Sequence, residues 1–430
     1  MMRRRRPAVL ILAAVLLLGA ACSSGGGTTA DTPAPAGTTT APAGSPGPPD
    51  SGGAATGAAP KALAASDDLY ARAASVPADE LDRPHGTLLA YQPVDPSPLP
   101  AARTYRILYV SAAADDHPVP VTGTVAVPDA APPADGRVVL TIAHGTSGSA
   151  DRCAPSRAKD LASSELPLGL MHGWIVAESD YQGMGTPGPH PYLVGPSEGR
   201  NVIDAALAAA QLPDADAGSR LAIAGYSQGG HGALWAAQVA PTWAPDLDVV
   251  GTFAGAPATE LDVILAALPV VPASGAFGLL MVEGFREAYG LDPTEVLTPA
   301  GLDVLAMVDD DVCVPAIAAK AATTPELFRR DVPRTGEWFE RVAESNPGQV
   351  ELGAPVLIIH SDQDRTVPVV LSETLFERMC KVGTVAERRV LVGGGDHGKA
   401  ATTAFPQAMT WLQERVDGQP PVDGCASASP

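Results

Sequence analysis

The chain is short of positive charge. Its 430 residues carry 28 Lys and Arg against 48 Asp and Glu, a net charge of −20, and without the four arginines at positions 3–6 the balance is 24 against 48, or −24. Binding to a nucleic acid depends on basic side chains that replace its counterions. We therefore expect no nucleic-acid partner.

Long apolar runs are also missing from most of the chain. After residue 21 no apolar stretch approaches the roughly 20 residues that a membrane-spanning helix needs, which excludes a polytopic membrane protein. The hydrophobic content is nevertheless 46%, enough over this length to bury a large core in one big domain or two ordinary ones. This composition excludes disorder throughout the chain, and we find no internal repeat.

The first residues have the composition of an export signal. Four arginines, the apolar run 8–18 and three small residues follow one another, so we assign residues 1–21 to a secretory signal peptide. Cys22 comes next, in a context that resembles the lipobox of bacterial lipoproteins, whose first mature residue is a lipidated cysteine. Gly19 stands where that pattern has an aliphatic residue, so the alternative is ordinary cleavage after Ala21 and release of the chain.

Residues 22–64 consist almost wholly of Ser, Gly, Thr, Pro and Ala. Such a composition cannot bury enough apolar surface to fold. We predict a disordered tether, and a lipid on Cys22 would be the only membrane contact of the protein.

Cysteine is scarce, and its spacing excludes one kind of site. Neither CxxC nor CxxH is present, which leaves little support for structural zinc. In an exported chain the remaining even set predicts two disulfides with three connectivities open. The set is Cys153, Cys313, Cys380 and Cys425.

Short β-branched runs bounded by Gly, Pro or Asp predict eight strands. They are 104–111, 120–127, 138–143, 174–181, 221–226, 249–254, 354–361 and 387–392. The first two are expected to form an antiparallel edge hairpin. The last six are continuous apolar runs separated by helical stretches such as 198–211 and 228–240, which is typical of a parallel sheet covered on both faces. The expected fold class is α/β, with a mostly parallel eight-stranded sheet.

The segment 259–353, between the sixth and seventh strands, has leucine and alanine at helical spacing and no strand-like run. The connecting helix of a βαβ unit needs only a dozen or so residues. We therefore predict a helical cap, or lid, inserted into a core made of residues 65–258 and 354–430.

The strongest functional signal is a G-x-S-x-G motif at residues 225–229. An apolar strand precedes it and a helix follows it. A serine on a sharp turn between a strand and a helix adopts strained backbone angles, and glycines on both sides make room for the close approach of the two elements. This context predicts that Ser227 is a nucleophile.

A serine hydroxyl is a weak nucleophile and needs a base that a third group orients. His231 lies one helical turn beyond Ser227, where a packing or surface role is expected. His360 precedes every suitable acid and so breaks the chain order serine, acid, histidine. His397, in a glycine-rich loop just after the last strand, is the predicted base. The acid should follow the strand 354–361.

Two aspartates, Asp362 and Asp364, are within range of that strand end. The alternative role for Asp362 is a turn residue whose side chain bonds its own loop.

Acyl transfer also needs hydrogen-bond donors for the developing oxyanion, each worth about 10²- to 10³-fold in rate. One is predicted to be the main-chain N–H of Gln228. The second should come from the loop after the third strand, from Thr146 or, as the alternative, Gly145. Residues 178–192 carry carboxylates and His190, but their spacing matches no metal pattern. We predict no metal there.

These motifs resemble those of the secretory lipase family of α/β-hydrolases, across nearly all of residues 65–430. The shared elements are Gly86-Thr87-Leu88-Leu89, the loop 143–148 followed by Cys153-Ala154-Pro155-Ser156, Asp180-Tyr181-Gln182-Gly183-Met184-Gly185, the segments 225–230 and 364–368, and His397. The resemblance implies a serine esterase or lipase with a helical cap and no cofactor.

The resemblance also favours one of the two candidate acids and one of the three disulfide connectivities. In α/β-hydrolases the acid usually stands three residues before a pair such as Val367-Pro368, which favours Asp364 over Asp362. In the family, the cysteine of the Cys-Ala-Pro-Ser run pairs with one in the cap, and a cysteine after the acid pairs with one beyond the base. This implies the pairs Cys153–Cys313 and Cys380–Cys425.

We therefore predict an exported carboxylic-ester hydrolase for small-molecule or lipid esters. It would form an acyl-enzyme on Ser227, with His397 as base and acid and Asp364 fixing the histidine tautomer. The same residues would also serve a serine peptidase or an acyltransferase. A non-catalytic cell-surface binding protein on a hydrolase scaffold is a further alternative, but it predicts a broken triad, and every expected element is present.

Overall fold

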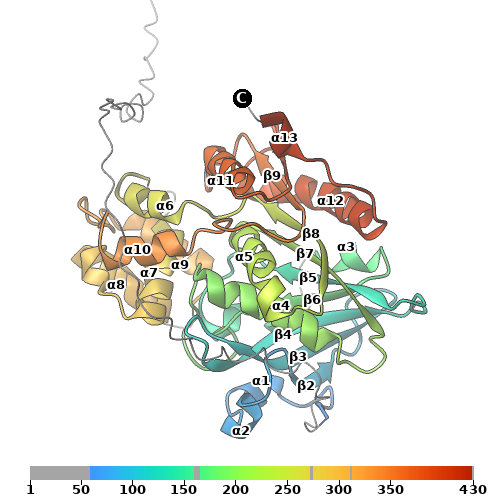
Figure 1. Cartoon of the computed structure of the whole chain (residues 1–430). Coiled ribbons are helices and arrows are strands. Elements are labelled where there is room, and N and C mark those ends of the chain that lie inside the picture. The colour runs from blue at the N-terminus through green and yellow to red at the C-terminus, as the bar shows by residue number, and fades with distance from the viewer. Residues whose placement is uncertain (1–58, 159–164, 272–274, 310–311, 429–430) are drawn as a thin grey trace, which may run out of the picture. The chain divides into compact units, whose positions relative to one another are not determined.

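The structure is a computed structural model that describes residues 59–158, 165–271, 275–309 and 312–428 (Figure 1). The predicted signal peptide, Cys22 and most of the predicted tether lie outside these residues. No helix in the described ranges is long and apolar enough to cross a membrane.

A ten-stranded sheet forms the centre of the described chain, in the order β1-β2-β3-β4-β6-β5-β7-β8-β9-β10. The strands are β1 (Lys61–Ala62), β2 (Leu88–Pro93), β3 (Ala102–Ala112), β4 (Pro118–Pro128), β5 (Arg137–Ala143), β6 (Ile175–Ser179), β7 (Ala217–Tyr226), β8 (Asp248–Gly255), β9 (Val356–Ser361) and β10 (Ala386–Leu391). The last six strands in the chain pair in parallel, whereas β2, β3, β4 and β6 pair antiparallel with one another in that order.

The α/β class and the parallel part of the sheet are confirmed, but the prediction of eight strands is wrong by two. β1 and β2 lie outside β3, so the hairpin of β3 and β4 is not at the edge. β1 has only two residues, and β2 is a run of six that ends at Pro93. Neither gives a distinct alternating or β-branched pattern.

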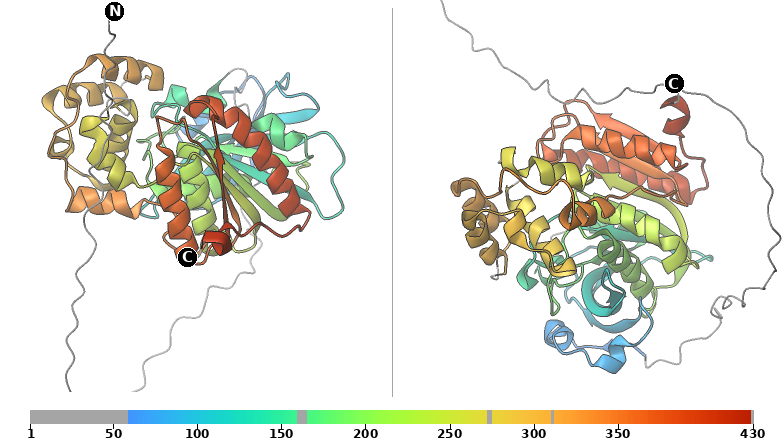
Figure 2. Two further views of the ribbon diagram at one scale, coloured as in Figure 1. Left: turned by 90° about the horizontal axis from the view of Figure 1, so that it is seen from above. Right: turned by 60° about the vertical axis from the view of Figure 1, so that its left-hand side comes forward.

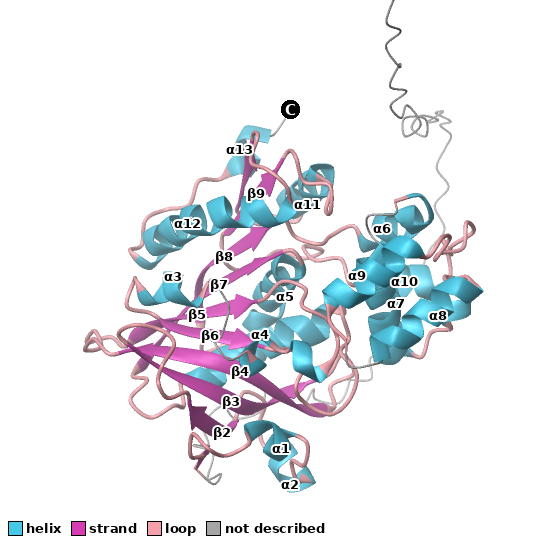
Figure 3. Cartoon of the chain, turned by 180° about the vertical axis from the view of Figure 1, so that it is seen from behind, coloured by secondary structure: helices cyan, strands magenta, loops and turns pink. Residues whose placement is uncertain are grey.

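Helices cover both faces of the sheet (Figures 2 and 3). On one face α4 (Gly195–Ala209), α5 (Gln228–Trp243) and α11 (Val369–Lys381) pack against the strands, and on the other lie α3 (Leu166–Leu170) and α12 (His397–Val416). Within β7, Leu221 and Ile223 belong to the buried cluster that includes α4 and α5, and Ala222 and Ala224 to the one that includes α12. This alternation follows from the two-residue period of a strand.

Shorter helices lie at the ends of the described chain. They are α1 (Leu69–Ala73) and α2 (Ala78–Leu81) before β2, and α13 (Gly424–Ala428) after α12.

Among its described residues, the segment between β8 and β9 consists of helices joined by loops and contains no strand. It contains α6 (Leu261–Ala267), α7 (Gly275–Tyr289), α8 (Pro299–Asp309), α9 (Val314–Thr323) and α10 (Glu337–Glu344). These helices bury their own apolar cluster, which includes Leu279, Phe285, Val304, Ile317 and Trp338. They form a separate lobe beside the sheet (Figure 1).

The two ends of this segment are bonded to each other and to the core. Asn346 accepts a 2.6 Å hydrogen bond from the N–H of Leu261 and donates a 2.7 Å one to Asp262. Arg378, on α11, pairs with Glu260 at 2.6 Å and donates to the carbonyl of Pro347 at 3.0 Å. We call residues 259–262 and 345–347 the neck.

Candidate active site

Ser227 lies on a strained turn between β7 and α5. Its φ of 62° and ψ of −122° are in a region that side chains with a Cβ rarely occupy. Its N–H donates to the carbonyl of Gly255 at 2.9 Å, which fixes the turn to the end of β8. The serine is partly exposed, unlike its buried neighbours Tyr226 and Gln228.

Close backbone approach explains the glycines of the G-x-S-x-G motif. A Cβ on Gly229 would lie 1.9 Å from the carbonyl oxygen of Ala143, and one on Gly225 would lie 2.0 Å from that of Gly229. Backbone atoms at these distances cannot give way as a flexible side chain would. The motif is therefore required by the packing of β5, β7 and α5.

The loop after β5 runs beside this turn, because Ala143 and Gly225 are register partners in the parallel pair β5 and β7. A Cβ on Gly145 would lie 3.4 Å from the carbonyl oxygen of Tyr226, the residue before Ser227. The Thr146 hydroxyl lies 2.8 Å from that of Tyr192. Both predicted sources of the second oxyanion donor thus belong to the loop that borders the serine turn.

His144, at the start of this loop, bonds the loop to neighbouring residues. It is buried, with Nδ1 2.7 Å from the carbonyl oxygen of Gly145, and its own carbonyl accepts a 3.0 Å hydrogen bond from Tyr181. These contacts give His144 a structural role in the loop.

His397 begins α12 and contacts Asp364. The two atoms His397 Nδ1 and Asp364 Oδ2 are 2.5 Å apart. The other carboxylate oxygen accepts hydrogen bonds of 2.9 Å from the N–H groups of Thr366 and Val367. Burial raises the pKa of Asp364, but hydrogen bonds from His360, His397 and Val367 outweigh it and hold the pKa well below its usual range. Asp364 is therefore a permanent carboxylate at neutral pH.

Of the residues that the sequence ranked lower, His360 contacts the predicted acid, whereas Asp362 and His231 have other partners. Asp362 is exposed and accepts a 2.8 Å hydrogen bond from the N–H of Gly393, a loop-bonding role. His360 Nε2 lies 2.9 Å from the carbonyl oxygen of Val367 and 3.3 Å from Asp364 Oδ2. His231 is fully buried on α5.

Sequence reasoning missed several partners of the predicted site. His360 bonds the same carboxylate as His397, and Tyr226 donates to the carbonyl of His397 at 2.8 Å. Glu198, a buried residue that accepts a hydrogen bond from the side chain of Gln228, was also not predicted as part of the site. The four-residue separation of His360 and Asp364 at a strand end was the only available signal, because the other contacts join distant segments.

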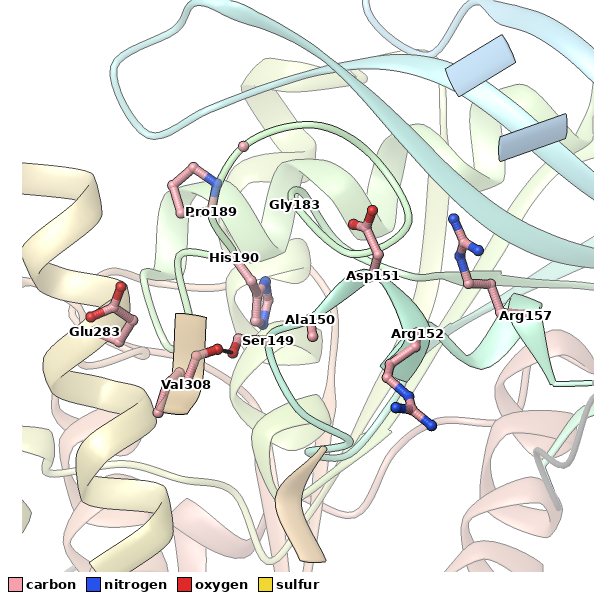
Figure 4. A pocket seen from close by; sticks show the side chains of 11 residues that line it. Ser149, Ala150, Asp151, Arg152, Arg157, Gly183, Pro189, His190, Glu283 and Val308 are labelled. Carbon is pink, nitrogen blue, oxygen red and sulfur yellow. Dashed lines mark hydrogen bonds between the residues drawn. The ribbon is translucent and has the colours of Figure 1, made fainter. Parts of the chain in front are cut away.

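Two cavities lie near the loop after β5. One of about 450 Å³ is lined by His144, Gly145 and Ser147 among others. A larger one of about 530 Å³ is enclosed by the segment 149–157, the loop 183–190 and the helices α7 and α8 (Figure 4). Ser227 lines neither of them.

The charged side chains of the larger cavity have partners in the fold. Arg157 lies 3.9 Å from the ring centre of Tyr70, and Asp151 accepts from the N–H of Gly185 at 3.0 Å. Glu283 pairs with Arg286. We therefore regard these groups as structural.

The carboxylates after β6 also have structural partners. Asp180 accepts from the N–H of Ser156 at 2.9 Å and from the hydroxyl of Thr122 at 2.7 Å. Burial raises the pKa of this carboxyl, and these hydrogen bonds oppose the shift. Within the described ranges no group of three or more His, Cys, Asp or Glu side chains could hold a metal ion.

Both disulfides have the predicted pairing. Cys153–Cys313 joins the segment after β5 to the start of α9, across a sequence separation of 160. Beside it the N–H of Val314 donates to the carbonyl of Ser147 at 3.1 Å. Cys380–Cys425 joins α11 to α13 across 45 residues. The first disulfide therefore fastens the start of α9 to the segment after β5, and the hydrogen bond to Ser147 joins α9 to the loop beside Ser227.

Comparison with solved structures supports the fold. The chain is similar to Candida antarctica lipase A in its closed state, with a TM-score of 0.66 and 19% identity over 84% of this chain and 88% of that one. This neighbour is an α/β-hydrolase. The α/β-hydrolase fold predicted from the motifs is confirmed.

Sequence comparison gives relatives of similar length. The secreted triacylglycerol lipase LIP4 of Malassezia globosa is 27% identical over 75% of this chain and 73% of that protein. The probable inactive lipase MT1628 of Mycobacterium tuberculosis is 26% identical over 78% of each chain. The family profile described as secretory lipase matches residues 164–294 and 337–424, just over half of the chain, and leaves out α8 and α9 entirely. The chain belongs to the secretory lipase family.

Proposed function

We propose that this protein is an exported serine esterase or lipase that hydrolyses carboxylic esters, including acylglycerol-type esters. The observation that carries the proposal is the approach of Asp364 and His397 to the serine turn. The carboxylate bonds the imidazole at 2.5 Å, and Tyr226, next to Ser227, bonds the carbonyl of His397 at 2.8 Å. This arrangement supports a triad of Ser227, His397 and Asp364.

In the proposed mechanism, His397 takes the proton of the Ser227 hydroxyl as its oxygen attacks the ester carbonyl. The N–H of Gln228 and a donor from Thr146 or Gly145 stabilise the oxyanion of the tetrahedral intermediate. The imidazolium then protonates the departing alcohol, which leaves an acyl-enzyme. A water molecule then attacks the acyl-enzyme by the same steps and releases the carboxylic acid and free Ser227. Asp364 keeps the Nδ1 proton in place throughout, so that Nε2 faces the serine.

The relatives support the ester substrate and the export. One is named a secreted triacylglycerol lipase, and others carry the name lipase A or lipase 5. We propose that residues 1–21 direct export, with or without a lipid on Cys22, and that the helical segment 259–353 is a lid over the site. Another relative is named as probably inactive, so activity depends on the residues that this chain has at the site. All three proposed triad residues are present here.

The test is turnover of a chromogenic ester series, from acetyl to long acyl chains, by the parent and by Ser227→Ala and His397→Ala. Each substitution should lower turnover by about 10⁶-fold, because triad members act as a unit. A matched chromogenic amide series separates an esterase from a peptidase. Hydrolysis that survives Ser227→Ala would contradict the proposal, as would an inactive, correctly folded parent.

A further inference from the structure

A buried carboxylate lies directly behind the serine turn. Glu198, in the first turn of α4, is 1% exposed. Its Oε1 accepts hydrogen bonds from Gln228 Nε2 at 2.8 Å and from the N–H of Leu193 at 2.9 Å. Its Oε2 lies 2.6 Å from His231 Nδ1. One side chain thus bonds Leu193, just before α4, and two residues of α5, Gln228 and His231.

The hydrogen-bond partners indicate which atoms of Glu198 and His231 carry hydrogens. His231 Nε2 lies 2.9 Å from the carbonyl oxygen of Ser345, which can only accept, so Nε2 carries a hydrogen. Glu198 Oε1 accepts two donors, and Oε2 and His231 Nδ1 share one hydrogen. Both side chains are fully buried and hydrogen-bonded to each other and to further partners, the condition under which buried polar groups are tolerated.

The same carboxylate fixes the side chain of Gln228. The Gln228 amide nitrogen also lies 3.1 Å from His190 Nε2. Burial lowers the pKa of His190 to about 4, and its Nδ1 lies 3.0 Å from the carbonyl oxygen of Gln182, so the neutral ring donates from Nδ1 and accepts at Nε2. Both amide hydrogens of Gln228 are therefore used. Rotating the amide by 180° would place its oxygen against the carboxylate.

Glu198 is also linked to Thr146, one of the other predicted oxyanion donors. Its bond to the N–H of Leu193 fixes the residue after Tyr192, and the hydroxyl of Tyr192 bonds that of Thr146 at 2.8 Å. Glu198 thus contacts Gln228 directly and is linked to Thr146 through two intervening residues, Leu193 and Tyr192. His231 extends the network to Ser345 in the neck, where Trp235 donates to the same carbonyl at 2.8 Å.

We propose that Glu198 and His231 are positioning residues, which hold Gln228 and the segment of Tyr192 and Thr146 so that the oxyanion donors keep their geometry. Neither residue touches the substrate. The inference rests on the proposed function, since it assigns a role in stabilising the oxyanion of ester hydrolysis. Preorganised donors matter because they act in the transition state and not in substrate binding.

The first test measures kcat and KM for ester hydrolysis by Glu198→Ala. We expect kcat to fall by about 10- to 100-fold, the scale of a misplaced reacting group, with KM changed by less than about threefold. Glu198→Gln should recover most of kcat, because its oxygen still accepts from Gln228 and Leu193 while its amide donates to Nδ1 of a neutral His231. Where Glu198→Ala does not fold, Gln228→Met removes both donated bonds, keeps the main-chain N–H and should show the same loss.

Asp204 provides a matched control on the same helix. It too is a fully buried carboxylate paired with a histidine, since Asp204 Oδ1 lies 2.7 Å from His85 Nδ1. Asp204→Asn should lower stability and leave kcat per folded molecule unchanged. A merely structural role for Glu198 predicts that its variants behave in the same way as Asp204→Asn.

An alkyl trifluoromethyl ketone gives the decisive readout, because Ser227 would convert it to a hemiketal whose oxyanion occupies the donor site. Its inhibition constant should rise in Glu198→Ala by the same factor by which kcat/KM falls. An unchanged inhibition constant, or a kcat loss no larger than that of Asp204→Asn, overturns this inference alone. A parent whose ester hydrolysis is absent or insensitive to Ser227→Ala overturns the proposed function and this inference with it.

Discussion

The hydroxyl of Tyr226 donates a 2.8 Å hydrogen bond to the main-chain carbonyl of His397, 171 residues further along the chain. Their rings lie 5.2 Å apart between centroids. The glycine-rich loop that precedes His397 is also bonded through Gly395, whose carbonyl accepts from the hydroxyl of Ser361 at 2.7 Å. These contacts hold the predicted base beside the residue that precedes the predicted nucleophile.

Tyr226→Phe removes that hydrogen bond and keeps the ring. We expect kcat for ester hydrolysis to fall by about 3- to 30-fold through misalignment of His397, with KM nearly unchanged. The free energy of unfolding should fall by about 1 kcal/mol. Tyr109→Phe is the control, because that hydroxyl bonds Ser179 at 2.7 Å away from the triad. Equal kcat values for the two variants would show that the Tyr226 contact has no role in alignment.

Asp364→Asn and Asp362→Asn separate the two candidate acids. Asp364→Asn should lower kcat by about 10⁴-fold, because an amide in place of the carboxylate favours the wrong histidine tautomer. Asp362→Asn keeps an oxygen for the N–H of Gly393 and should change kcat by less than about threefold. Steady-state kinetics at neutral pH measure both. If Asp362→Asn is the more damaging change, the assignment of Asp364 as the acid is wrong.

The sequence predicted the parts of the site that depend on local signals. The strand, turn and helix around Ser227 follow from an apolar run and two glycines, whose necessity the 1.9 Å and 2.0 Å approaches explain. The six parallel strands were visible because strands buried on both faces are continuous apolar runs. His397 followed from chain order and from its loop after the last strand.

The remaining features depend on contacts between distant segments. Glu198 and His231 are 33 residues apart and look like ordinary helical positions until α4 and α5 pack together. β2 is recognisable only through its pairing with β3, since Leu88–Pro93 has no distinct alternation. Partners of this kind have no local pattern, so periodicity and turn chemistry could not identify them.

Acidification should destabilise the fold in two steps. A free histidine takes up its proton near pH 6.5, but the buried His190 does so only near pH 4, so the unfolded chain binds more protons between these values. The free energy of unfolding should therefore fall as the pH drops from about 6.5 to 4, by an amount of order 3 kcal/mol. Chemical denaturation at a series of pH values measures it. The slope should be weaker in His190→Gln, and an unchanged slope would contradict the assignment.

The second step comes from Asp364, whose pKa is held below its usual range. Its contribution to stability is complete above about pH 4, the pKa of the unfolded aspartate, and is lost as the pH falls further. Asp364→Asn should remove this second loss and leave the first in place. If the free energy of unfolding of Asp364→Asn still falls below pH 4, that loss comes from other carboxylates.

The two disulfides should differ in their effect on activity. Each closes a long loop, and a chain-entropy estimate gives roughly 4 to 5 kcal/mol for either as an upper figure. Replacing Cys153 and Cys313 together by serine should lower both the Tm and kcat, because this bond fastens α9 to the segment after β5. The same change at Cys380 and Cys425 should lower the Tm alone. A larger kcat loss in the second variant would contradict the proposed role of the first bond.

Covalent labelling of Ser227 tests the central claim most directly. A p-nitrophenyl alkylphosphonate reacts with an activated serine, whose oxygen bonds to phosphorus as p-nitrophenolate leaves. Mass spectrometry of the digested protein should find one phosphonyl group per molecule, on the peptide that contains Ser227, with esterase activity lost in proportion. Ser227→Ala should release no p-nitrophenolate and carry no label. A label on another residue that abolishes activity, or full activity with Ser227 labelled, would contradict the account.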